Sequence, residues 1–176
     1  MWADILLSFR QELIVTVILF FLLFIKIGAK EYKNEIILHL VNALLLANFI
    51  LCFFACRDAT LFAGMFHTNR LIVLEKNMLN LATLIVSLQA YSWLKGHRQV
   101  LEFYMLLLAT LTGFFFMISA GNLLMFYLGL ELSTIPLAAL SAWDLEKRQS
   151  SEAAMKFILS SAFSSALLLF GISLLY

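Results

Sequence analysis

The sequence consists almost entirely of long apolar runs, and short charged segments separate these runs. A helix needs about 20 mostly apolar residues to cross the hydrocarbon core of a bilayer. Hydrophobic residues make up 63% of the 176-residue chain and charged residues 13%, whereas soluble domains have about 45–50% and about 25%. One core of this size cannot hide so much apolar surface, because a small domain leaves much of its surface facing solvent. Lipid is therefore the expected solvent, and the sequence predicts an all-α, polytopic bundle of transmembrane helices.

Six apolar runs are long enough to span a membrane. They cover residues 10–27, 36–55, 71–94, 101–120, 122–142 and 152–176. Only a short turn with Gly121 separates the fourth run from the fifth, which predicts a tight helical hairpin. A short interfacial helix is expected at residues 61–66, before the third span.

Lysine and arginine residues in the short loops predict the orientation, because such residues are more frequent on the cytoplasmic side of a membrane. One side of the predicted bundle carries seven of them and the opposite side four. The seven are Lys26, Lys30, Lys33, Lys95, Arg98, Lys147 and Arg148, and the four are Arg10, Arg57, Arg70 and Lys76. We therefore expect a multi-pass membrane protein whose amino terminus lies outside the cytoplasm. No cleavable signal is expected, since no A-x-A-like site follows the first run.

Composition and motifs argue against several classes of function. The formal net charge of +1 provides no strongly charged face for nucleic acid. Cys52 and Cys56 lie one helical turn apart without nearby His or Asp residues, which makes a poor metal site. The sequence contains no Gly-rich phosphate loop, no nucleophile–base pair and no Cys/His cluster. We expect no cofactor, no metal and no catalytic residue in this chain.

One carboxylate, Glu131, lies in the middle of the fifth predicted span. At 1.5 Å per residue it is roughly 14 Å from Asn122 and roughly 18 Å from Trp143, near the midplane of the bilayer. An acidic residue at that depth costs roughly 2.5–3.5 kcal/mol on insertion, and its short side chain cannot reach an interface. The carboxylate is therefore expected to face the bundle interior, a partner cation or internal water.

The neighbours of Glu131 are the polar or small residues of one helical stripe. That stripe consists of Tyr127, Glu131, Thr134, Ala138 and Ser141. Pro136 has no N–H, so the carbonyl of Leu132 loses its partner within the helix. Backbone groups freed beside an acid can hold water.

Two interpretations of Glu131 remain open from the residues. A carboxylic acid balanced between desolvation and a nearby cation can titrate near neutral pH and pass a proton onward. Alternatively, a protonated glutamate forms a hydrogen bond between helices and only fixes their packing. Buried membrane acids commonly mark ion or proton pathways, which favours the relay.

Lys156 is a second relay candidate, since it lies in the sixth predicted span. It could extend back to the interface, pair with Glu152 at the i,i+4 spacing, or point inward toward Glu131. Other polar residues have simpler interpretations. His39 and Asn42 are expected to form hydrogen bonds between helices, and Ser161 and Ser165 to allow close packing.

Two segments of the sequence carry a family resemblance. They are "LEFYMLLLATLTGFFFMISAGNLLMFYLGLELSTIPLAALSAW" and "SSEAAMKFILSSAFSSALLLFGISLLY". They resemble the N subunits of bacterial NADH-quinone oxidoreductase (respiratory complex I), which are antiporter-like membrane subunits. The "LGLEL" core is shared more loosely with multisubunit cation/proton antiporters and membrane-bound hydrogenases.

The resemblance implies roles for the buried charged residues and for partner proteins. It identifies Glu131 with the family's essential fifth-helix glutamate and Lys156 with a sixth-helix lysine. It implies proton translocation coupled to quinone reduction in other subunits. The expected partners are the other membrane subunits of complex I and lipid. The resemblance also implies that the membrane is the inner (plasma) membrane and that the amino terminus lies in the periplasm. NAD, FMN, iron–sulfur clusters and quinone are expected in partner subunits, and none in this chain.

The resemblance also implies a division of the chain. Residues 1–100 are expected to form three amino-terminal helices, and residues 101–176 to form helices four to six, the truncated start of the first antiporter-like repeat. The family's broken seventh helix and its lysine do not occur in the sequence, so an amino-terminal fragment is expected. The open alternatives are a subunit of a cation/proton antiporter or membrane-bound hydrogenase, and a structural scaffold in which Glu131 only fixes packing.

Overall fold

The structure is a computed structural model that describes residues 8–28, 33–51, 58–97, 99–144 and 147–175. Its six helices are each long and apolar enough to cross a membrane. They are α2 (Arg10–Gly28), α3 (Asn34–Leu51), α4 (Arg70–Leu94), α5 (Val100–Ile118), α6 (Leu123–Ser141) and α7 (Arg148–Leu175). The six predicted spans are confirmed, and their ends differ from the helices by a few residues. Cys52 and Cys56 lie outside the described residues.

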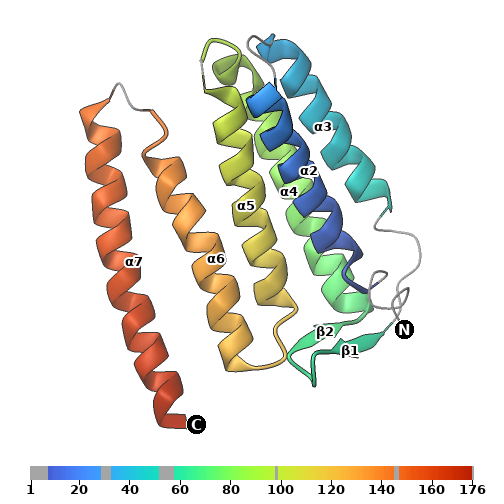
Figure 1. The fold of residues 1–176 in the computed structure, drawn as a ribbon, viewed down its shortest axis with the longest axis vertical. Coiled ribbons are helices and arrows are strands. Elements are labelled where there is room, and N and C mark those ends of the chain that lie inside the picture. The colour runs from blue at the N-terminus through green and yellow to red at the C-terminus, as the bar shows by residue number, and fades with distance from the viewer. Residues whose placement is uncertain (1–7, 29–32, 52–57, 98, 145–146, 176) are drawn as a thin grey trace.

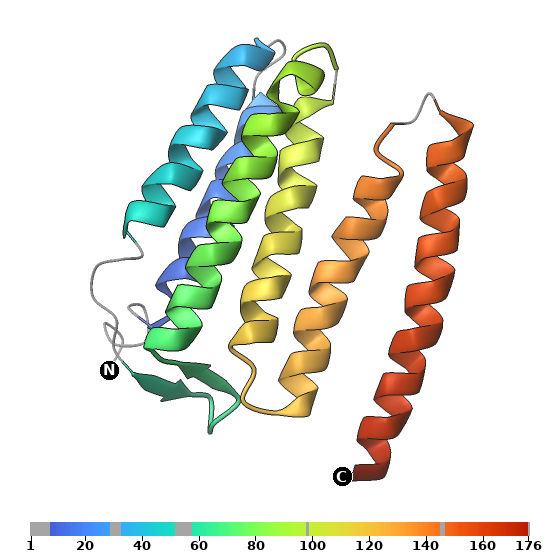
Figure 2. The same cartoon turned by 180° about the vertical axis from the view of Figure 1, so that it is seen from behind.

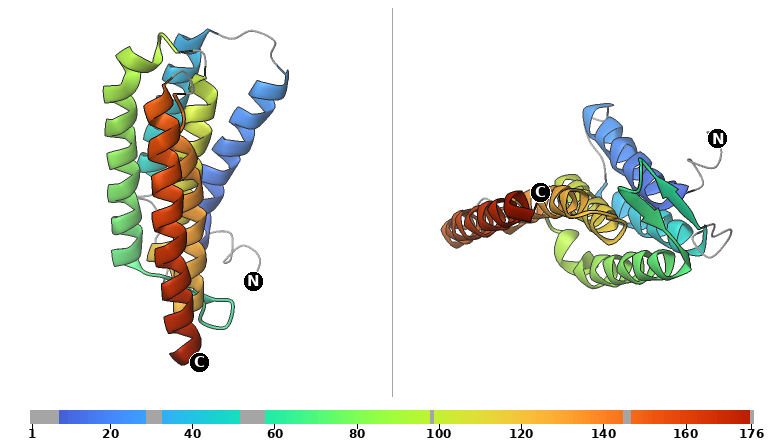
Figure 3. Two further views of the ribbon diagram at one scale, coloured as in Figure 1. Left: turned by 90° about the vertical axis from the view of Figure 1, so that its left-hand side faces the viewer. Right: turned by 90° about the horizontal axis from the view of Figure 1, so that it is seen from below.

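The helices form a bundle with one projecting side. Helices α2, α3, α4 and α5 pack together, whereas α6 lies beside α5 and α7 beside α6 (Figures 1 and 2). Seen along the helix axes, α5, α6 and α7 form a row that extends away from the bundle (Figure 3). Helix α6 therefore has α5 on one side and α7 on the other.

Helix α5 is the centre of the hydrophobic core. Its buried residues recur every three or four positions, which places them on faces covered by α2, α3 and α4. They include Leu101, Tyr104, Leu108, Leu111 and Phe115. Helix α7 differs, since most of its large apolar side chains are exposed. Exposed apolar side chains on this scale are consistent with a lipid environment.

Polar side chains connect α3 to α4 inside the bundle. The Ser87 hydroxyl lies 2.5 Å from Asn42 Oδ1 and 2.8 Å from the Tyr104 hydroxyl. The hydroxyl of Tyr91 lies 3.2 Å from His39 Nε2. The predicted hydrogen bonds of His39 and Asn42 between helices are thus confirmed.

The expected interfacial helix at residues 61–66 is wrong, because these residues belong to an antiparallel β-hairpin. Its strands are β1 (Ala59–Leu61) and β2 (Phe66–Thr68). Phe62 and Ala63 have φ of 53° and Gly64 has φ of 89°. Three successive left-handed residues are incompatible with a right-handed helix.

The hairpin is hydrogen-bonded to the turn between α5 and α6. The backbone N–H of His67 donates to the carbonyl of Ser119 at 2.9 Å, and that of Gly121 donates to the carbonyl of Met65 at 2.8 Å. A Cβ at Gly121 would collide with the Gly64 carbonyl and the His67 ring. The turn therefore requires glycine because the hairpin approaches so closely. Directly after it, Asn122 Oδ1 accepts from Met125 N–H at 2.8 Å and caps α6.

Two glycines bring the backbones of α5 and α6 into contact. A Cβ on Gly113 of α5 would overlap the backbone of Leu132 and Ser133 on α6. A Cβ on Gly129 of α6 would lie 2.6 Å from the backbone nitrogen of Met117 on α5. Small residues at helix contacts permit such approach within a membrane.

Replacing Gly113 by alanine should weaken the α5–α6 contact. Overpacking costs about 1–3 kcal/mol, and here the colliding atoms are backbone that cannot rotate away. We expect a lower free energy of unfolding in a detergent titration. Gly171→Ala is the matched control, since nothing lies within 4 Å of a Cβ there; its expected effect is neutral or stabilising. Equal stability of Gly113→Ala and wild type would contradict the contact.

Candidate functional site

The side chain of Glu131 points toward the groove between α6 and α7. It is the ninth of the 19 residues of α6, so it lies near the middle of the helix. Its side chain is half-buried. The groove has a volume of about 510 Å³, and it lies where the two neighbouring helices run side by side (Figure 1).

Small and polar side chains line this groove from both helices. Those from α6 are Tyr127, Glu131, Thr134, Ile135, Ala138 and Ala139, and those from α7 are Ile158, Ser161, Ala162, Ser165, Ala166 and Leu169. Four members of the predicted stripe are thus on one side of α6. The fifth, Ser141, lies beyond the groove and donates to the Ala138 carbonyl at 2.7 Å.

The Glu131 carboxylate has no fixed hydrogen-bond donor on one of its oxygens. Within the described part of the chain, Oε1 is buried and receives no hydrogen bond. The nearby Thr134 hydroxyl donates to the Leu130 carbonyl at 3.0 Å instead. A buried carboxylate oxygen without a donor is energetically unfavourable. Water in the groove would supply the missing donor.

Pro136 lies within α6 but does not end the helix, which continues to Ser141. The carbonyl that Pro136 leaves without an N–H belongs to Leu132. The backbone of Leu132 lies against Gly113 of α5. The side of α6 that meets α5 therefore carries the disrupted hydrogen bond.

Lys156 is not a neighbour of Glu131 in the described structure. Its ammonium lies 2.6 Å from Glu152 Oε1, and both side chains are mostly exposed, at 75% and 63%. Lys156 does not line the groove. Of its three expected geometries, the structure has the i,i+4 pair with Glu152. The relay role of Lys156 remains a prediction.

Sequence reasoning did not assign the α7 side of the groove to the site. Ser161 and Ser165 were expected to allow close packing, and they line the groove together with Ala162 and Ala166. The small-xxx-small spacing was the available signal, since such a face lets another helix approach a buried acid. Among the described residues there is no cluster of His, Cys, Asp and Glu that could hold a metal ion.

A bulky side chain in the groove should shield Glu131 from a hydrophobic carbodiimide, which reacts with protonated carboxyl groups. We expect Ala162→Phe to lower the labelling of Glu131 strongly, because position 162 lines the groove. Ser160→Phe adds the same ring to an exposed position of α7 and should leave labelling unchanged. Mass spectrometry of the labelled peptide is the measurement. Equal labelling of both variants would show that α7 does not cover Glu131.

Comparison with known proteins places the two carboxyl-terminal helices in a known family. Residues 120–176 match the family described as "NADH:quinone oxidoreductase/Mrp antiporter, TM". NADH-quinone oxidoreductase subunit N of Phocaeicola vulgatus is 50% identical over 123 residues, which are 68% of this chain and 26% of that protein. The protein of the same name from Bartonella bacilliformis is 34% identical over 171 residues, which are 94% of this chain and 34% of that protein. The chain thus spans about a quarter to a third of these relatives.

Two solved structures have a similar fold. A chain of respiratory complex I from Thermus thermophilus superimposes with a TM-score of 0.74 at 22% identity, over 94% of this chain and 36% of that chain. A chain of the archaeal membrane-bound sulfane sulfur reductase gives a TM-score of 0.63 at 22% identity, over 100% of this chain and 37% of that one. Both likenesses concern the fold. The sequence matches show that the chain is homologous to N subunits of NADH-quinone oxidoreductase, and that its residues 120–176 match the NADH:quinone oxidoreductase/Mrp antiporter family.

Proposed function

We propose that the chain is part of a proton-translocating membrane subunit of an NADH:quinone oxidoreductase, and that Glu131 takes up and releases the transported proton. One observation carries the proposal. An acid in the middle of a membrane-spanning helix has a buried oxygen without a donor and faces a groove of small and polar side chains. Such a carboxyl group can change its protonation state without breaking a fixed ion pair.

Lys156 has a supporting role in this proposal. Its exposed ammonium is paired with Glu152, so it would deliver charge to the relay by exchanging partners. Tyr127 and Thr134 line the same groove as Glu131 and would orient water beside its carboxylate. NAD, FMN, iron–sulfur clusters and quinone would be bound by other subunits, and the partners of this chain would be membrane subunits of the same complex.

Glu131→Gln should impair proton pumping in the assembled complex by about tenfold or more, because glutamine cannot carry the proton. Assembly and electron-transfer capacity should remain normal. Glu75→Gln is the control, since it removes a carboxylate of the same type from an exposed position of α4. Pumping is measured in proteoliposomes with a pH-sensitive dye. Unchanged pumping would reject the relay, and failure of assembly would favour the scaffold in which Glu131 fixes packing.

The family match leaves one further candidate, a cation/proton antiporter subunit, because the matched family includes the Mrp antiporters. Purification of the native complex distinguishes the two. Flavin and iron–sulfur subunits should copurify if the protein is part of a NADH:quinone oxidoreductase. Their absence together with sodium-dependent proton exchange would favour the antiporter.

We propose in addition an amino terminus on the periplasmic side of the inner membrane. Lys76, on the side with fewer positive charges, is buried in an ion pair with Glu12 and does not present its charge to the membrane surface. The count becomes seven against three. On the lysine-rich side the hydrogen bond to the exposed Glu35 carboxylate raises the pKa of Lys95, which keeps that ammonium charged.

Cysteine labelling tests the orientation. In a variant with Cys52 and Cys56 replaced by serine, Thr60→Cys reports on the hairpin and Gln149→Cys on the start of α7, at opposite ends of the bundle (Figure 1). A membrane-impermeant maleimide added to the periplasmic side should modify residue 60 and leave residue 149 unmodified. The reverse pattern would invert the topology.

A further inference from the structure

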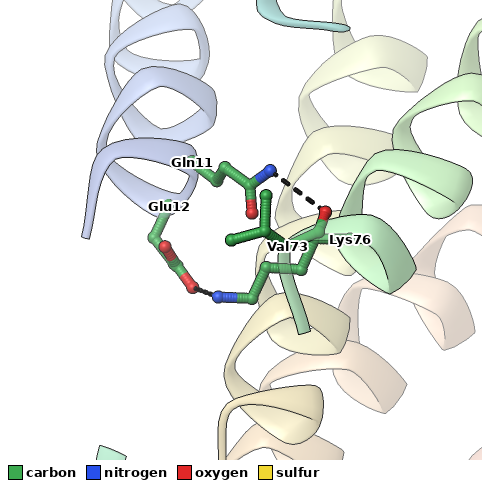
Figure 4. A network of polar contacts seen from close by, with 4 residues as sticks. All are labelled: Gln11, Glu12, Val73 and Lys76. Atoms are coloured by element: carbon green, nitrogen blue, oxygen red, sulfur yellow. Dashed lines mark hydrogen bonds and ion pairs between the residues drawn. The ribbon is translucent and has the colours of Figure 1, made fainter. Parts of the chain in front are cut away.

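A buried ion pair lies between α2 and α4, away from Glu131. Lys76 Nζ forms an ion pair with Glu12 Oε1, and the side chains are only 1% and 3% exposed (Figure 4). Gln11, the neighbour of Glu12, donates to the Val73 carbonyl at 3.5 Å. Glu12 lies in the first turn of α2, and its carboxylate points into the bundle.

Burying two charges is unfavourable unless both are paired and their remaining polar atoms are satisfied. The ion pair between Glu12 and Lys76 meets this condition only in part. Within the described residues, Glu12 Oε2 is buried and receives no hydrogen bond. The carboxylate is therefore paired on one oxygen and undersatisfied on the other.

Two asparagines along α4 have the same deficit. Asn77 and Asn80 are 5% and 1% exposed, and the Oδ1 atom of each is buried without a donor in the described part of the chain. The Asn80 amide nitrogen donates to the Leu45 carbonyl of α3 at 3.2 Å, so this side chain is fixed in place. All three atoms are acceptors, and each of them lacks a donor among the described residues.

The space around these acceptors is bounded at both ends. Toward the hairpin, the buried Phe66 ring lies 5.0 Å from Lys76 Nζ. Toward the other end of α4, Leu84 is 9% exposed and separates Asn80 from Ser87. Beyond Leu84, the hydroxyl groups of Ser87 and Tyr104 are hydrogen-bonded to each other. The three acceptors of Glu12, Asn77 and Asn80 therefore lie in the part of the bundle between Phe66 and Leu84.

The position of the pair gives this segment a route to water. Glu12 is the third residue of α2 and Lys76 the seventh of α4, and both helices begin at the hairpin end of the bundle (Figure 1). At 1.5 Å per residue the two residues are roughly 3 Å and 9 Å from the starts of their helices. Both residues therefore lie close to the end of the bundle where water is nearest.

We propose that Glu12, Lys76, Asn77 and Asn80 form an internal water-binding site under the β-hairpin. Bound water donates hydrogen bonds to Glu12 Oε2 and to the two asparagine oxygens, which are the acceptors that the described protein leaves without donors. The site holds a hydrated ion pair that is separate from the Glu131 groove. It does not depend on the function proposed for Glu131.

Radiolytic footprinting of the full-length protein in membranes tests this site, because hydroxyl radicals formed from bound water modify adjacent side chains. Phe66 and Phe115 are a matched pair of reporters, since both are phenylalanines with 0% and 1% exposure. Phe66 lies beside Lys76, whereas Phe115 lies in the apolar core. We expect several-fold more modification of Phe66. Equal modification of the two rings would overturn the proposal, and this comparison needs no variant.

Two variants identify the groups that hold the water. Replacing both charges by methionine, Glu12→Met with Lys76→Met, should reduce Phe66 modification to the level of Phe115, and apolar replacement of a buried pair is commonly tolerated. Ser87→Ala removes a polar group beyond Leu84 and should leave Phe66 modification unchanged. Wild-type modification in the double variant would show that the pair does not hold the water.

Discussion

The arrangement of this chain depends on the close contact between α5 and α6. Gly113 and Gly129 let the two backbones meet where any side chain would intervene. Ser133, which is buried against α5, and Glu131 are two residues apart and therefore lie on nearly opposite sides of α6. Since α5 fixes one side of α6 in place, the opposite side presents its acid to α7. The hairpin adds a second constraint, because it is bonded to the turn from which α6 begins.

The bundle contains two kinds of buried polar group. Ser87 is hydrogen-bonded to both Asn42 and Tyr104, and such bonds specify how α3, α4 and α5 fit together. Glu12 and Glu131 each retain a carboxylate oxygen without a donor in the described residues. A fully satisfied network stabilises one arrangement, whereas an unsatisfied acceptor needs water or a proton. We therefore expect functional roles at buried polar groups whose hydrogen bonds are incomplete, such as the carboxylates of Glu12 and Glu131.

Much of the fold could be predicted from the sequence, because lipid imposes length and apolarity on every span. The six helices and the stripe around Glu131 follow from these patterns. The hairpin could not be predicted, since its three left-handed residues depend on contacts with the α5–α6 turn. The Glu12–Lys76 pair joins residues 64 positions apart, and no local pattern reveals such a contact. The i,i+4 spacing of Glu152 and Lys156 predicted their pairing, although the sequence left two other orientations of the Lys156 side chain open.

The depths of the two acids have an electrical consequence. Moving one elementary charge across a membrane is worth about 2.3 kcal/mol per 100 mV. Glu131 lies halfway along α6, so a proton that reaches it from either surface crosses about half of that field and gains or loses about 1 kcal/mol per 100 mV. Glu12 lies at the beginning of α2 and experiences little of the voltage drop. A membrane potential would therefore act strongly on a charge that moves between the surface and Glu131, and only weakly on one that moves between the surface and Glu12.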